Sequence, residues 1–257
     1  MKRLVALLVA VMMFVSAFCL QAFAYDASFI GYVAEGAKEC MDPSDIFNFV
    51  LAGGHESAPI RIVPAKLNQG GEERDIYLIG LVGVETQKNQ VNVFATTIPA
   101  AFNKENVYTK LIKETLKDKI PAGANIVLAG HSLGGMVAQQ IAADKEVKDN
   151  YNIITTITAG SPYIMTKDRE GTLVRLCDKY DAVPYLSPAT LVRLDLQLGG
   201  FRIARDCGYF FNPDGAHNLS YRQTEYWNDL DALAVKDGDS QIYFDYADII
   251  LVGRVPN

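Results

Sequence analysis

The sequence has few of the residues that bind transition metals or cross-link a chain. Its 257 residues include three histidines and four cysteines, and the cysteines lack the paired spacing of a zinc site. Cys19 lies in the N-terminal leader described below, so only Cys40, Cys177 and Cys207 could supply an internal disulfide. The spacing does not indicate which pair, or whether any pair, is bonded.

The sequence also lacks an excess of positive charge. Aspartate and glutamate number 30 against 24 lysines and arginines, which gives a net charge of −6. Nucleic acids and anionic membranes attract basic surfaces, so we expect neither as a partner of this acidic chain. No repeat, linker or low-complexity stretch divides the sequence, and its length suits a single α/β domain.

A long apolar run occurs only at the N-terminus. Lys2-Arg3 is followed by an apolar stretch from Leu4 to Val15, and Ala22-Phe23-Ala24 has the small-x-small pattern of a cleavage site. We therefore predict a signal peptide over residues 1–24, a single domain over residues 25–257, and a secreted or periplasmic location. The alternative is a retained membrane anchor over residues 4–20.

Hydrophobic patterning predicts strands that alternate with helices. Apolar repeats at helical spacing follow the start signal Asp42-Pro43-Ser44-Asp45, run from Val107 to Leu116 and run from Met136 to Ala143. Short β-branched and apolar runs predict strands over residues 60–67, 76–82, 126–129, 153–158 and 172–177. This alternating order predicts an α/β fold.

The segment Gly130-His131-Ser132-Leu133-Gly134-Gly135 stands between a predicted strand and a predicted helix. This is the G-x-S-x-G pattern of a nucleophile elbow, in which a sharp turn presents the serine hydroxyl above a sheet. The N–H groups at the start of the next helix would stabilise negative charge there. Ser132 is therefore the candidate nucleophile, and the alternative is a tight turn with no chemical role.

A serine hydroxyl needs a neighbouring base, and the chain offers three histidines. In hydrolases built on this elbow the order along the chain is serine, acid, histidine. His55 precedes the elbow, and we expect the His131 side chain to point away from the face that Ser132 presents. His217 is therefore the candidate general base, and the alternative is a surface histidine.

Eight aspartates lie between Ser132 and His217. Asp178 and Asp181 directly follow the predicted strand 172–177, and functional groups of α/β sheets gather at the carboxyl ends of strands. Asp181 is favoured because Pro184 would fix a rigid extended turn beside it. Asp178 remains the second candidate, and a solvated loop carboxylate is the alternative for either residue.

Four segments in this order resemble the class 3 lipase family, the fungal-type branch of the α/β-hydrolases. They are the elbow, Thr158-Ala159-Gly160-Ser161-Pro162, Asp181-Ala182-Val183-Pro184, and Ala216-His217-Asn218-Leu219. The resemblance implies a mostly parallel central sheet with helices on both faces. It also implies a serine ester hydrolase in which Ser132, Asp181 and His217 act through an acyl-enzyme intermediate, with no cofactor or metal.

The resemblance is weaker upstream of the elbow. Val82-Gly83-Val84 stands where the family usually has a polar step such as Arg-Gly-Thr, so it implies Val84 as one oxyanion-hole donor beside Leu133, without a supporting hydroxyl. The family forms a lid near residues 91–102. Val93, Phe94, Ile98 and Phe102 are therefore candidates to line an acyl site, and an ordinary buried loop is the alternative.

The implied partner is a lipid or small-ester substrate, with transient contact to a lipid surface as a further expectation. An acyltransferase or thioesterase would use the same triad, and a peptidase is a weaker alternative because no side-chain specificity pocket is indicated. A non-catalytic lipid-binding relative is the alternative from another class. Acyl-chain length, the choice among lipase, phospholipase and esterase, and oligomeric state are not predicted by the sequence.

Overall fold

The computed structural model describes residues 38–40, 43–52, 58–83, 93–166, 168–191 and 200–253. The predicted signal peptide, His55 and Val84 lie outside the described residues. The side chains of Val93 and Phe94 also lie outside them. None of the helices within these ranges combines the length and the apolar character that crossing a bilayer would require.

The described strands form one nine-stranded sheet in the order β1-β8-β2-β3-β4-β5-β6-β7, with β9 also paired to β2. Every ladder from β3 to β7 is parallel, whereas β2 is antiparallel to each of its neighbours. The strands are β1 (Lys38–Cys40), β2 (Ile60–Gln69), β3 (Glu72–Leu81), β4 (Asn125–His131), β5 (Asn152–Ala159), β6 (Thr172–Asp178), β7 (Phe201–Arg205), β8 (Gln241–Asp245) and β9 (Ile250–Val252).

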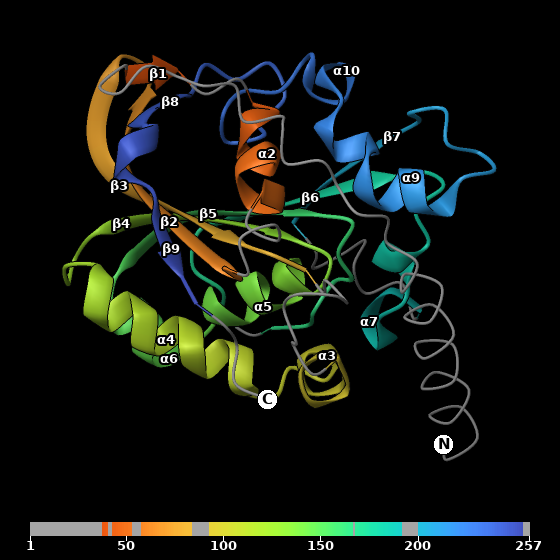
Figure 1. The fold of residues 1–257 in the computed structure, drawn as a ribbon, viewed down its shortest axis with the longest axis horizontal. Helices are drawn as coiled ribbons and strands as arrows, with labels where there is room; N and C mark the ends of the chain where they lie inside the picture. The colour runs from red at the N-terminus through yellow and green to blue at the C-terminus, as the bar shows by residue number, and fades with distance from the viewer. Residues whose placement is uncertain are drawn as a thin grey trace.

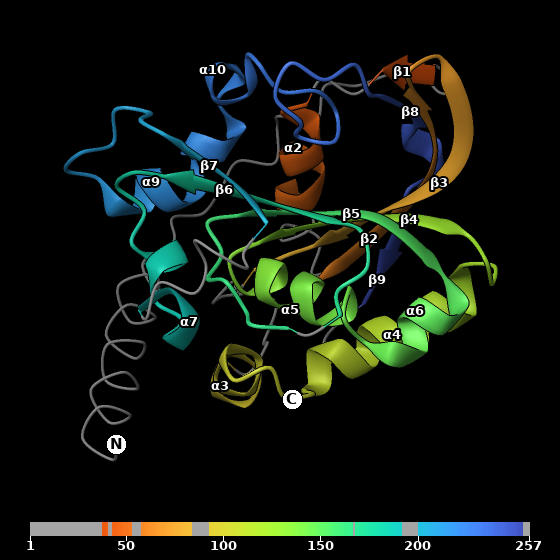
Figure 2. The same cartoon turned by 180° about the vertical axis from the view of Figure 1, so that it is seen from behind.

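Helices cover both faces of the sheet (Figure 1). One face carries α2 (Asp45–Ala52), α9 (Pro213–Asn218) and α10 (Thr224–Trp227), and the other carries α3 (Val93–Ala101), α4 (Val107–Lys119), α5 (Leu133–Ile141) and α6 (Lys145–Asn150). The reverse view in Figure 2 shows the same two layers, with the short α7 (Pro188–Leu191) beyond the carboxyl ends of the strands. The predicted α/β architecture is confirmed.

Each face of the sheet has its own apolar cluster because successive strand residues point to opposite sides. Val127 and Ala129 of β4 pack with α2 and the segment 221–234, whereas Ile126 and Leu128 pack with the helices of the other face. Burial on both faces explains why these strands are nearly continuous apolar runs. The same burial fixes the register of β4, and therefore where the residues after it emerge.

The predicted strands and helices correspond to β2–β6, α2, α4 and α5, with boundaries shifted by a few residues. Residues 91–102 were expected to form a lid or a loop. The described part is α3, which contains Pro99 within the helix. The pattern did not indicate β1 or the later strands β7, β8 and β9. All four are short segments, and the pairing partners of β1, β8 and β9 lie far away in the sequence.

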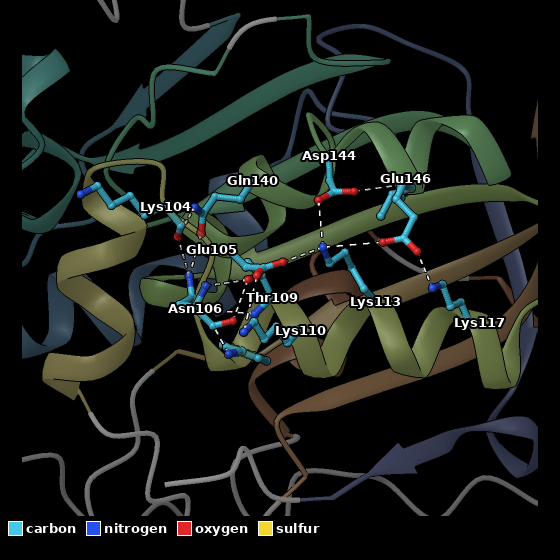
Figure 3. Close-up of polar contacts among 12 residues, drawn as sticks. Lys104, Glu105, Asn106, Thr109, Lys110, Lys113, Lys117, Gln140, Asp144 and Glu146 are labelled. Atoms are coloured by element: carbon cyan, nitrogen blue, oxygen red, sulfur yellow. Dashed lines mark hydrogen bonds and ion pairs between the residues drawn. The ribbon is translucent and has the colours of Figure 1, made fainter.

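Helix α4 is tied to α6 by an ion-pair cluster around Lys113 (Figure 3). The Lys113 Nζ lies 2.7 Å from Glu105 and 3.3 Å from Asp144, and also faces Glu146 at 3.7 Å. Asp144 caps α6 by accepting the N–H of Val147. The hydrogen bond with Glu105 raises the pKa of Lys113, so the lysine is a cation at neutral pH.

Replacing Lys113 with Met should lower the free energy of unfolding by about 1–2 kcal/mol, because the lysine is largely covered and serves three carboxylates. Urea denaturation at low and high salt would measure the loss. The matched control is Lys145→Met, which breaks only an exposed ion pair with Asp149 and should cost less than about 0.5 kcal/mol. Equal losses in the two variants would contradict a stabilising role of the cluster.

Candidate functional site

Ser132 occupies a strained position between β4 and α5. Its backbone angles are φ 54° and ψ −122°, in a region that side chains rarely adopt. The turn is tight enough that a Cβ on Gly130 would lie 2.5 Å from the carbonyl oxygen of Gly134. The Ser132 N–H donates to the carbonyl of Ala159 at 3.0 Å. The elbow therefore holds a half-buried hydroxyl at the carboxyl end of the central strands.

The structure brings His217 of α9 to the Ser132 hydroxyl. The Nε2 atom of His217 lies 3.1 Å from Ser132 Oγ, and its Nδ1 atom lies 3.0 Å from Asp181 Oδ2. A carboxylate can only accept, so Nδ1 carries the hydrogen and Nε2 is left to accept the serine proton. His217 and Asp181 are 5% and 1% exposed, so water hardly competes for this hydrogen bond.

The two candidate aspartates have different surroundings. Asp181 accepts the Val183 N–H on Oδ1 and faces His217 with Oδ2. Asp178 is also buried, but its two oxygens accept the backbone N–H groups of Tyr180 and Cys207 at 2.8 and 3.2 Å. Asp178 therefore organises the backbone after β6, while Asp181 is the carboxylate beside the imidazole.

The segment after Asp181 is not the extended turn that its proline suggested. Residues Val183–Tyr185 form the 3-10 helix η4, with Pro184 inside its first turn. A proline is tolerated there because the N–H that it lacks would have no partner within the helix. The rigidity expected of this segment comes from a helical turn and from the bond between the Val183 N–H and Asp181.

Tyr221 is a site residue that the sequence did not indicate. Its hydroxyl donates to Asp181 Oδ2 at 2.6 Å and accepts the N–H of Asp178 at 3.0 Å. Burial raises the pKa of Tyr221 well above its usual value, so the hydroxyl stays protonated and keeps donating. Tyr221 is one of 13 tyrosines, and only its place four residues after His217 could have singled it out.

His131 also lies at the site, beside His217, although the sequence indicated only that its side chain would point away from the face that Ser132 presents. Its ring is 4.6 Å from the His217 ring, and its Nε2 lies 2.7 Å from the carbonyl oxygen of His217. Burial is the largest cause that lowers the pKa of His131 to about 3, so its ring is neutral. The sequence pattern indicates which way this side chain leaves β4, but it does not indicate that α9 folds over it.

Gly160 leaves the space that the Asp181–His217 pair occupies. Its φ is +56°, and a Cβ there would lie 2.8 Å from Asp181 Oδ2 and 3.0 Å from His217 Nδ1. Any side chain would meet both partners of the hydrogen bond while holding a strained backbone. This contact gives a physical reason for the glycine in the Gly160-Ser161-Pro162 segment.

The candidate oxyanion donors are only partly within the described residues. Leu133 is the first residue of α5, where N–H groups have no partner within the helix. Gly83 packs against the elbow, since a Cβ on it would lie 2.9 Å from the Ser132 Cβ. Val84 directly follows Gly83 and lies outside the described residues. The end of β3 is therefore next to Ser132.

The remaining candidates lie on or beside α3. Ile98 is half-buried, and Phe102 is 43% exposed just after the helix. Ala100 and Ala101 belong to the same apolar cluster as Leu133, so α3 packs beside the elbow.

Cys177 and Cys207 are free, with Cys177 buried in β6. Among the described residues, no group of three or more His, Cys, Asp or Glu is placed to hold a metal ion.

Comparison with known protein families gave a match that overlaps part of the candidate site. The family model described as lipase (class 3) matches residues 77–190, a range that contains β4, the elbow and Asp181 but ends before His217. The match supports a hydrolase of the lipase or esterase type with a lipid or ester substrate, and the sheet is consistent with an α/β-hydrolase fold. No curated protein and no solved structure gave a significant match.

Proposed function

Residues 77–190 of the chain belong to the class 3 lipase family, and we infer that this protein hydrolyses carboxylic esters with Ser132 as its nucleophile. One observation carries the inference. His217 lies 3.1 Å from the Ser132 hydroxyl and 3.0 Å from Asp181. A hydroxyl in contact with an oriented imidazole can lose its proton as it attacks a carbonyl carbon, which makes it a competent nucleophile.

The proposed reaction has two halves. Ser132 Oγ bonds to the ester carbonyl carbon while His217 Nε2 takes its proton, and the imidazolium then gives that proton to the departing alcohol. Water next attacks the acyl-enzyme, gives a proton to His217, and the acid leaves as the proton returns to Ser132. Asp181 keeps the ring in the required tautomer and stabilises its positive charge in both halves.

The oxyanion is proposed to bind at the start of α5. The Leu133 N–H would be one donor, and the N–H of Val84 would be the second. Donors of this kind contribute most because they are fixed in place before charge develops on the oxygen. The packing of Gly83 against the elbow supports the assignment of its neighbour.

We propose that α3 borders the acyl group of the substrate. Val93, Phe94, Ile98 and Phe102 would supply apolar side chains, and this helix shares a cluster with Leu133 beside the nucleophile. Phe102 keeps much of its ring exposed, which leaves apolar surface available to a fatty chain or a lipid surface. The substrate class that fits this arrangement is an ester with an apolar acyl group.

An acyl-chain series of nitrophenyl esters tests the function and this acyl site together. We expect turnover of the wild type to depend on chain length, and Phe102→Ser to lower the ratio of long-chain to short-chain kcat/KM by about tenfold, since it removes one large apolar contact. Phe211→Ser is the matched control, because Phe211 is 91% exposed in the loop before α9. An unchanged ratio in Phe102→Ser would remove the proposed acyl contact.

Product analysis separates hydrolysis from acyl transfer. With water as the only acceptor, the protein should release free acid from an oxygen ester. Transfer of the acyl group to an added alcohol or thiol should not be faster than this release. Faster formation of a new ester or thioester would make the protein a transferase instead. No turnover of any ester by correctly folded protein would favour a non-catalytic lipid-binding role.

The N-terminal leader, residues 1–24, bears on where the protein is located. We propose that residues 1–24 direct export and are removed after Ala24, which gives a secreted or periplasmic enzyme. The basic start, apolar run and small-x-small end of this segment support the proposal. Mass spectrometry of the exported protein should find an N-terminus at Tyr25, whereas an intact leader in a membrane fraction would indicate an anchor.

A further inference from the structure

His131 joins the strand that carries the nucleophile to the helix that carries the base. It is the last residue of β4 and directly precedes Ser132, and its side chain is buried. Its Nε2 atom lies 2.7 Å from the carbonyl oxygen of His217. A carbonyl can only accept, so the His131 Nε2 carries the hydrogen and donates it.

The acceptor lies where a helix needs an outside donor. His217 is in the last turn of α9, and the final carbonyl groups of a helix have no partner within it. Because α9 has only six residues, its backbone alone holds its direction weakly. The His131 donor therefore fixes the main chain of the residue whose ring faces Ser132.

The His131 ring has further neighbours at the site. A Cβ on Gly83 would lie 3.5 Å from His131 Nδ1, so the segment just after β3 runs near this atom. The ring centroid of Tyr221, which donates to Asp181, is 6.0 Å away. Because the Nε2 hydrogen of His131 is donated to the His217 carbonyl, this nitrogen cannot accept the proton of Ser132.

We propose that His131 is a positioning residue that sets the distance between the His217 imidazole and the Ser132 hydroxyl. Two consecutive residues at the end of β4 hold His217, one by its carbonyl at 2.7 Å and one by its ring at 3.1 Å. A shift of α9 would change both contacts together. The proposal rests on the proposed ester hydrolysis, because only then does this distance control a reaction.

Three substitutions separate the donor from the volume of the ring. His131→Gln keeps an N–H donor at the reach of the imidazole Nε2, His131→Asn has the same amide one carbon shorter, and His131→Leu has no donor. We expect Leu and Asn to lower kcat for a short nitrophenyl ester by about 10–100-fold with KM nearly unchanged, since small misplacements of reacting groups have effects of this size. Gln should retain kcat within about threefold of the wild type.

Loss of stability is controlled separately. Ile141→Ala, at the far end of α5, removes a buried side chain away from the site and should leave kcat unchanged while weakening resistance to urea. If the Leu variant does not fold, the comparison of Gln with Asn still varies only the reach of the donor.

The outcomes distinguish this inference from the proposed function. Retained turnover in Ser132→Ala would overturn the function itself. If Ser132→Ala is inactive but His131→Leu or His131→Asn keeps the wild-type kcat, the positioning role is wrong while the function stands. Equal losses in Gln, Asn and Leu would likewise overturn it, because restoring the donor would then have no effect.

Discussion

Replacing Ser132 with Ala is expected to lower kcat for ester hydrolysis by about 10⁴-fold or more, because the atom that forms the acyl-enzyme is removed. Alanine is close in size, and the elbow backbone is held by the Ser132 N–H bond to Ala159, which the substitution keeps. Folding should therefore be preserved. Steady-state kinetics with a nitrophenyl ester and labelling by a fluorophosphonate would both report the loss.

Ser240→Ala is the matched serine control. Ser240 is buried in the segment before β8, where its backbone N–H donates to Asp231 and is unaffected by the change. Its kcat should equal that of the wild type. A Ser132→Ala variant that keeps a tenth of wild-type turnover, in a preparation free of other esterases, would rule out Ser132 as the nucleophile.

The second large effect is expected at Asp181. In Asp181→Asn an amide replaces the carboxylate that accepts the His217 Nδ1–H, so the imidazole can take the tautomer that is wrong for accepting the serine proton. We expect kcat to fall by about 10³–10⁴-fold at neutral pH, with little change in KM. Kinetics on the folded variant, checked by circular dichroism, measure this loss.

Asp178→Asn provides the comparison, because Asp178 is equally buried and only three residues away. Its oxygens accept the Tyr180 and Cys207 N–H groups, so the substitution should cost about 1–2 kcal/mol of stability. Its effect on kcat should be far smaller than that of Asp181→Asn. The reverse ranking would assign the acid to Asp178 and contradict the observed geometry.

The sequence predicted what depends on local pattern. The predicted parts of strands β3 to β6 are mostly buried on both faces, so their apolar and β-branched runs are visible without a partner. The elbow combines a turn, a serine and a following helix within six residues. The order of Ser132, Asp181 and His217 also anticipated which side chains the structure brings together, although their roles remain proposals.

Contacts made by folding over long distances were not visible in the sequence. Tyr221 reaches Asp181 across 40 residues, and His131 reaches the His217 backbone across 86. Neither residue type is unusual where it stands, and its partner is fixed only once α9 lies over the end of β4. Strands β8 and β9 were missed for the same reason, because short segments gain their conformation from the ladder that they join.

The pairing of β8 and β9 with β2 has a consequence for the order in which the chain can fold. Synthesis delivers β2 long before Gln241 to Val252, so the early chain carries an open strand edge until β8 and β9 are made. Contacts of such long sequence separation form slowly, because a large loop must close first. Completion of the sheet therefore waits for β8 and β9 to emerge, and until then the unpaired β2 edge is exposed to misassembly.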